Sequence, residues 1–230
     1  MNQGLSINFR PLYRIAQYFA LAMIIIIPLQ IIIFVISPPP ETVKGFFELY
    51  HQNPFLGLLS LDFLYLINNM ILVIVYLALF VVLYQEKPVT SLLAFILGLI
   101  SIACYYPSNP AFEMLTLGNQ YFQTLPEQQT IYLAAGEAVM AGYTGTTFNT
   151  YYVLGTICLL LFSYAIIKSH IFKKSVGLWG LASGFFMIVP SSAGMLGMIF
   201  SLLSLIPWIV FVVLLMLKFK KLALDAQNAE

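Results

Sequence analysis

Long apolar segments, separated by short polar turns, are the feature of this sequence that most restricts its fold. The first runs from Ile15 to Ile36, and a membrane-spanning helix needs about 20 such residues. Hydrophobic residues make up 61% of the chain and charged residues only 8%, against about 25% in soluble domains. A soluble fold of this size cannot hide that much apolar surface. The sequence therefore predicts an all-α integral membrane protein.

The turn signals divide the chain into six predicted spans, which form one membrane domain over residues 1–230. The spans are expected at about residues 13–36, 55–84, 89–106, 147–168, 175–190 and 195–218. The connection 108–146 is too long for a structureless loop. We expect external helices there, at about 110–123 and 126–140 with a break near Leu125, and a short interfacial helix over 43–50.

The basic residues are distributed unevenly between the two sides of these spans. Six spans put both termini on one side, which receives nine of the ten Lys and Arg residues and leaves only Lys44 opposite. Because basic residues concentrate in cytoplasmic loops, both termini are predicted to be cytoplasmic. The net charge of +1 gives no support to a nucleic-acid partner.

Polar side chains recur at helical spacing within the second predicted span. Asp62, Tyr65, Asn69 and Tyr76 share one face if residues 55–84 form a continuous helix. A carboxylate in a membrane span is costly and usually faces a bundle interior or a wet cavity. Two interpretations stay open. The stripe is a ligand or ion site, or its side chains hydrogen-bond neighbouring helices near the outer interface.

A second polar group lies near the start of the span at 147–168, level with Asp62 in the predicted bundle. It comprises Glu137, Tyr143, Asn149 and Tyr152. Together with the stripe, these residues are predicted to line an outward-facing ligand pocket. The alternative interpretation is a hydrated rim with an aromatic belt, which is common at membrane interfaces.

Glycines at small-xxx-small spacing mark the fifth predicted span. Gly177, Gly180 and Gly184 lie on one face, and such faces let helices approach closely. Packing within the bundle is the first interpretation. The alternative is an interface with a membrane-protein partner or a second copy of the chain.

Motifs of known chemistry are absent. The sequence has no phosphate-binding loop, zinc-protease helix or nucleophile elbow, and the spacing of Cys104 and Cys158 matches no metal motif. We therefore predict no cofactor and no metal site, with membrane lipids as surroundings. The favoured function is binding of a small amphipathic or apolar ligand in a sensory or transport-type role. A non-catalytic membrane subunit is the alternative, and an intramembrane enzyme using Asp62 comes third.

Two short stretches and the layout resemble a known family. Arg14-Ile15-Ala16 leads into the first span, and Leu205-Ile206-Pro207-Trp208 runs toward Lys218 in the last. With the six-span layout and the long third-to-fourth connection, these resemble a bacterial family of small multi-pass membrane proteins of unassigned function. The resemblance implies the fold class and a location in a bacterial inner membrane, and it supplies no site residues.

Overall fold

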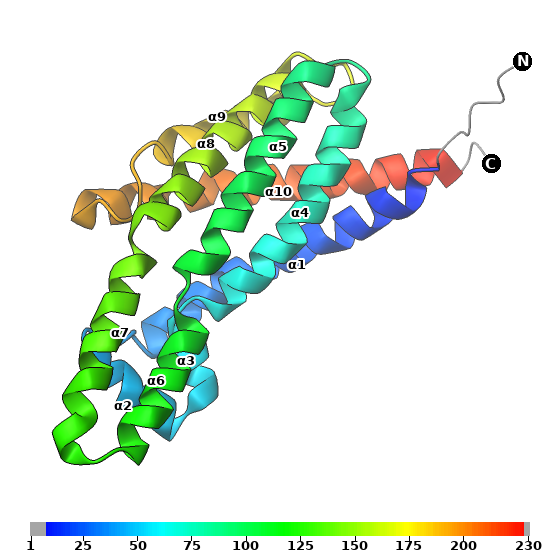
Figure 1. The fold of residues 1–230 in the computed structure, drawn as a ribbon. Coiled ribbons are helices and arrows are strands. Elements are labelled where there is room, and N and C mark those ends of the chain that lie inside the picture. The colour runs from blue at the N-terminus through cyan, green and yellow to red at the C-terminus, as the bar shows by residue number, and fades with distance from the viewer. Residues whose placement is uncertain (1–7, 228–230) are drawn as a thin grey trace, which may run out of the picture.

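The computed structural model describes residues 8–227, and every helix or strand assigned in that range is a helix. In chain order the elements are α1 (Arg10–Ile36), α2 (Val43–Gln52), α3 (Pro54–Ser60), α4 (Phe63–Tyr84), α5 (Pro88–Tyr105), η1 (Tyr106–Ser108), α6 (Ala111–Gln123), η2 (Pro126–Gln128), α7 (Gln129–Tyr143), α8 (Thr146–Ile167), α9 (Lys174–Phe186) and α10 (Gly194–Gln227). Helices α1, α4, α5, α8, α9 and α10 form a bundle, and α2, α3, α6 and α7 form a smaller lobe at one end (Figure 1). The predicted all-α class is confirmed.

Five helical segments in the described residues are long and apolar enough to cross a membrane. They are Arg10–Ile36, Phe63–Tyr84, Pro88–Gln123, Pro126–Ile167 and Gly194–Asp225. A multi-pass membrane protein is therefore confirmed, but a count of six spans is not. The segment predicted at 175–190 forms α9, which has 13 residues. It ends at Phe186, four residues before Pro190, and a proline would itself interrupt a helix that continued to that position.

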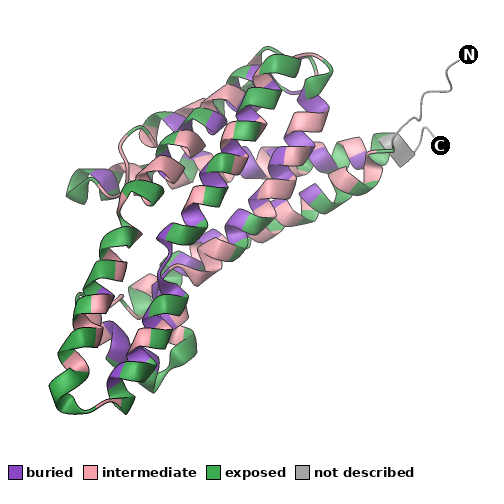
Figure 2. Cartoon of the chain, in the orientation of Figure 1, coloured by how far each residue is buried: buried purple, intermediate pink, exposed green. Residues whose placement is uncertain are grey.

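The bundle buries a narrow apolar core and exposes much of its apolar surface. Ala16, Ala20 and Met23 on α1 are fully buried, whereas Val35 and Ile36 near its end are 76% and 78% exposed. Figure 2 shows exposed residues along the outer faces of the long helices. Apolar exposure on this scale is typical of a surface that faces lipid, not water.

Two polar turns of the bundle lie side by side at the end away from the lobe (Figure 1). The backbone N–H of His170, in the α8–α9 turn, donates to Oε2 of Glu86 in the α4–α5 turn at 2.7 Å. The ammonium of Lys218 lies 5.6 Å from the ring centroid of Phe172, which brings the last part of α10 to the same place. These three segments carry most of the basic residues.

The lobe has a hydrophobic core of its own. Phe47, Tyr50, Met114 and Tyr121 are buried in it, and the Tyr50 hydroxyl donates to the carbonyl oxygen of Ala111 at 2.8 Å. Burial, together with the charge of Glu113, raises the pKa of Tyr50 well above its usual value. The hydroxyl therefore stays protonated and keeps this bond between α2 and the start of α6.

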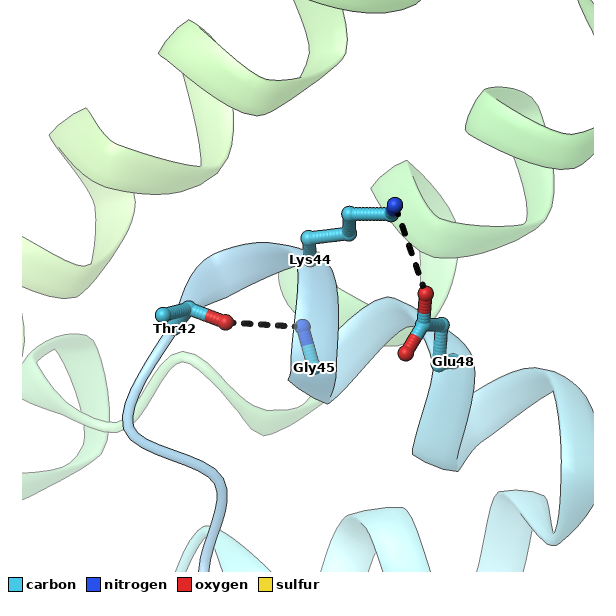
Figure 3. A network of polar contacts seen from close by, with 4 residues as sticks. All are labelled: Thr42, Lys44, Gly45 and Glu48. Atoms are coloured by element: carbon cyan, nitrogen blue, oxygen red, sulfur yellow. Dashed lines mark hydrogen bonds and ion pairs between the residues drawn. The ribbon is translucent and has the colours of Figure 1, made fainter.

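Local contacts define the start of α2 (Figure 3). Oγ1 of Thr42 accepts a hydrogen bond from the backbone N–H of Gly45 at 3.1 Å, which satisfies one of the free donors of the first turn. One turn on, the Lys44 ammonium lies 3.7 Å from Oε1 of Glu48. The one Lys or Arg side chain of the lobe is thus paired, while Glu113, Glu127 and Glu137 leave the lobe acidic.

The predicted helix over 55–84 is wrong, because the chain breaks between α3 and α4. Asp62 has a left-handed backbone with φ of 58°, which Asp tolerates better than most residues. Side chains satisfy the carbonyl groups around the break. Nε2 of Gln30 donates to the Leu59 carbonyl at 2.9 Å, and Nδ2 of Asn109 donates to the Leu61 carbonyl at 2.7 Å. Asp62 therefore precedes α4 and does not form part of it.

The other helices follow the predictions closely. The connection over residues 108–146 contains α6 and α7 with the expected break around Leu125, and α2 covers the predicted interfacial helix. The last helix is longer than predicted, since α10 continues from residue 218 to Gln227. Its final turns carry Lys220 and Lys221, beyond the apolar stretch from which the span was predicted.

Candidate functional site

Side chains from all six bundle helices line a cavity of about 290 Å³. Its wall is largely apolar, with Ile27 and Ile31 from α1, Leu72 from α4 and Leu205 from α10 among the contributors. The polar side chains in the wall are Gln30, Asp62, Tyr65, Asn68, Tyr76, Ser101, Tyr105, Tyr151, Tyr152, Ser183, Ser191, Ser201 and Ser204. A concave, mainly apolar pocket with a few convergent polar groups is the usual form of a small-molecule site.

Asp62 is the point where the cavity meets the lobe. Its carboxyl lines the cavity, and Oδ2 accepts a hydrogen bond from the hydroxyl of Tyr143 at the end of α7. Burial raises the pKa of the Asp62 carboxyl, while the bond from Tyr143 acts to lower it. The break before α4 thus places an acid where lobe and bundle contact each other.

Aromatic rings surround the part of the cavity next to Asp62. The ring centroid of Tyr105 lies 5.5 Å from that of Tyr65 and 4.8 Å from that of Tyr151. Phe148 continues the cluster, with its centroid 6.0 Å from that of Tyr151. The hydroxyl of Tyr151 donates to the hydroxyl of Tyr65 at 3.4 Å. Helices α4, α5 and α8 therefore meet through rings at this end of the cavity.

Two amide side chains complete the polar part of the wall. Gln30 is 6% exposed, and its bond to the Leu59 carbonyl fixes which end of the amide is the oxygen. Within residues 8–227, Oε1 of Gln30 has no hydrogen-bond partner, and neither has Oδ1 of Asn68, which is 2% exposed. Buried acceptors without partners are uncommon in folded proteins and call for an explanation.

The structure brings together some of the residues predicted for the pocket. Asp62, Tyr65, Tyr76 and Tyr152 all line the cavity, and Tyr143 joins them through its bond to Asp62. The predicted neighbourhood of the stripe and the start of the fourth span is therefore present, although the stripe is not one continuous helix.

Three other predicted residues lie elsewhere. Asn69 is fully buried but does not line the cavity, because the cavity face of α4 carries Asn68 in its place. Glu137 is exposed on α7. Asn149 donates to the carbonyl oxygens of Thr144 and Gly145 at 3.0 and 2.9 Å, so it supports the α7–α8 junction.

Sequence reasoning missed Gln30. It stands alone as an amide between Leu29 and Ile31, deep in the first apolar run, and a polar residue in such a run commonly faces the protein interior. That signal indicates a polar side chain inside the protein, but it does not identify the hydrogen-bond partner of Gln30. The Leu59 carbonyl can accept this bond only because the helix breaks before α4. No local sequence pattern predicts that break.

The glycine face of α9 packs inside the bundle. A Cβ atom added to Gly180 would meet Ser163 on α8 and Phe211 on α10, and one added to Gly184 would meet Leu160 at 2.7 Å. One added to Gly177 would meet the backbone of α8. Because α8 and α10 fill this face, it is not free for another protein.

The sequence profile of a family described as Domain of unknown function (DUF4386) matches residues 16–220. The chain belongs to the DUF4386 family. The match covers the bundle and the lobe, from α1 to the last part of α10, and confirms the resemblance to a family of unassigned function. No curated protein and no solved structure matches the chain, so the site of this DUF4386 protein is interpreted from its own geometry.

The raised pKa of Asp62 predicts that the thermal stability of this DUF4386 protein depends on pH. An unfolded Asp titrates near pH 3.9. Between that value and its raised native pKa, Asp62 binds a proton more tightly in the folded chain, so stability falls as pH rises through this window. Asp62→Asn should remove this contribution, because Asn is neutral, tolerates the left-handed backbone and can accept the bond from Tyr143.

Thermal unfolding in detergent between about pH 4 and about pH 8 checks this prediction. The Tm of the wild type, relative to that of Asp62→Asn, should fall as pH rises. Glu137→Gln removes an exposed carboxyl of the lobe and should follow the wild type. A difference between wild type and Asp62→Asn that stays constant over the whole range contradicts the prediction.

Proposed function

We propose that this DUF4386 protein binds a small amphipathic or apolar ligand in the cavity between its bundle helices, in a sensory or transport-type role. The observation that carries the proposal is the cavity itself, with an apolar wall, a cluster of aromatic rings and two buried acceptors that have no partner in the described residues. Its volume of about 290 Å³ lies close to the lower end of the range for small-molecule pockets.

We further propose six membrane crossings. The short helix α9 crosses in addition to the five longer segments, and both termini lie in the cytoplasm of a bacterial cell. The contact between the Glu86 and His170 turns and the position of Lys218 beside Phe172 support this orientation, since they gather basic segments at one end. The acidic lobe then lies outside, and the end of the cavity at Asp62 faces it. Membrane lipids surround the bundle.

A cavity-filling variant tests the binding role. Leu205 lines the cavity, and Leu205→Trp places a larger side chain there, so a small molecule that copurifies with the wild type should be lost. Native mass spectrometry of the purified chain measures the retained mass. Leu203→Trp on the same helix is the matched control, because Leu203 is 43% exposed and does not line the cavity.

The mass spectrometry experiment has two decisive outcomes. Retention of a small molecule by the wild type and by Leu203→Trp, with loss in Leu205→Trp, supports a ligand in the cavity. The same retained mass in Leu205→Trp contradicts the proposal, because the ligand would then lie elsewhere on the protein.

A further inference from the structure

The charge of the cavity restricts the ligands it can hold. Among its described lining residues Asp62 is the one acid, and none is Lys, Arg or His. An anion would therefore find no positive partner there. A carboxylate taken out of water is stabilised by a cation that enters with the ligand, and isolated buried charge is costly.

The buried acceptors point to a ligand that donates hydrogen bonds. The amide of Gln30 is oriented by its own bond to the Leu59 carbonyl, so its Oε1 is a buried acceptor, without a partner in residues 8–227, on a residue that lines the cavity. Oδ1 of Asn68 is a second acceptor in the same wall. Both need N–H or O–H donors, and an ammonium group supplies several from one atom.

The rings next to Asp62 favour the same chemistry. Cations are attracted to aromatic faces within about 6 Å of the ring centroid. Tyr65, Tyr105 and Tyr151 form such a cluster beside the acid. A metal ion is a poorer match, because no group of three His, Cys, Asp or Glu side chains in residues 8–227 could hold one.

We infer that the cavity binds a small organic ammonium ion, with its nitrogen beside Asp62 and its apolar body between the bundle helices. The inference rests on the proposed binding function and names the class of ligand. Ile27, Leu72 and Leu205 supply the apolar wall for the body. The ammonium group can come from a free amine or from the ethanolamine headgroup of a lipid, and both offer N–H donors on a positive nitrogen.

Phenethylammonium is a suitable probe, with phenethyl alcohol as its neutral isostere and phenylacetate as its anionic counterpart. The full chain is placed in nanodiscs of phosphatidylcholine, whose quaternary nitrogen has no N–H. The chain has two Trp residues. Trp179→Phe leaves Trp208, which lines the cavity, as the only tryptophan, and its fluorescence reports binding.

We expect phenethylammonium to bind at least about tenfold more tightly than phenethyl alcohol, because a close charge pair adds that much or more. Asp62→Asn should abolish this preference while the variant still binds phenethyl alcohol. Glu137→Gln removes a carboxyl outside the cavity and should keep the preference. Asn68→Leu removes one acceptor and should reduce ammonium binding more than alcohol binding, which tests the inference independently of Asp62.

The outcomes separate the two proposals. If the alcohol binds the wild type as tightly as the ammonium ion, the ammonium inference is overturned and the cavity remains a binding site. If none of the three probes binds and Leu205→Trp retains the same copurified mass, the proposed function fails as well. Competition by added phosphatidylethanolamine would assign the ammonium group to a lipid headgroup, and its absence would assign it to a free amine.

Discussion

Gly180→Leu should strain the packing of α9 against α8 and α10 and lower the Tm of the purified protein by about 6–12 °C. The glycine lies against Ser163 and Phe211, which are 0% and 2% exposed, so neither can move into free space. Overpacking of this kind costs about 1–3 kcal/mol, and the upper end of that range corresponds to this shift for a chain of this size. Poor yield and aggregation in detergent are expected with it.

Thermal unfolding and size-exclusion chromatography check this prediction together. Ser175→Leu adds the same side chain to an exposed position of α9 and should behave as the wild type. If α9 instead served as an interface with another protein, Gly180→Leu would keep its Tm and change only its oligomeric mass. That result would contradict the intramolecular packing of the glycine face.

Phe47→Ala should unfold the lobe while the bundle stays folded. Phe47 is fully buried, its ring centroid lies 5.4 Å from that of Tyr121, and it contacts the positions of Gly118 on α6 and Gly136 on α7. Loss of a buried phenylalanine costs about 3–5 kcal/mol. The lobe has a separate small core, so most of that loss falls on α2, α6 and α7.

Hydrogen exchange measured by mass spectrometry locates the effect. Protection should be lost across residues 111–143 and retained in α4 and α8. Phe55 lies on α3 and its side chain is 62% exposed. Phe55→Ala should therefore leave the protection pattern unchanged. Uniform loss of protection over bundle and lobe would show that the two parts unfold as one unit.

Phe47→Ala should also affect the cavity, because the lobe contacts it through Asp62. Tyr143 packs against the core of the lobe and donates its hydroxyl hydrogen to Asp62. When the lobe unfolds, Asp62 loses this partner although every bundle helix remains in place. The lobe is therefore the support for one wall of the candidate site.

The helices that could be predicted from sequence are those whose ends carry local signals. Thr124 and Pro126 mark the break between α6 and α7, and Pro88 starts α5. The bundle helices can be predicted from the lengths of the apolar runs, because a segment that spans a lipid bilayer must make all its backbone hydrogen bonds internally, as a helix does. Apolarity alone did not separate α9 from the longer helices, since a 13-residue helix that packs one face against α8 and α10 has the composition of a span.

The break at Asp62 could not be predicted, because the groups that stabilise it are remote in sequence. Gln30 and Asn109 are 29 and 48 residues from the carbonyl groups that accept their bonds. Over residues 55–84 the sequence is mainly apolar and its polar residues recur at helical spacing, so the local pattern predicts that the helix continues through Asp62. For the same reason the sequence predicts Asn69 on the cavity face, whereas the structure puts Asn68 there.

The two-residue connection at Leu61 and Asp62 sets the rotational phase of α4. A helix turns about 100° per residue, so one residue more or fewer between Ser60 and Phe63 would swing Asn68 and Tyr65 away from the cavity and carry lipid-facing side chains inward. The hydrogen bonds that Gln30 and Asn109 donate to backbone carbonyl groups at the break fix this rotation of α4 from two sides. In this chain, the length of this connection is as much a part of the candidate site as the side chains that line it.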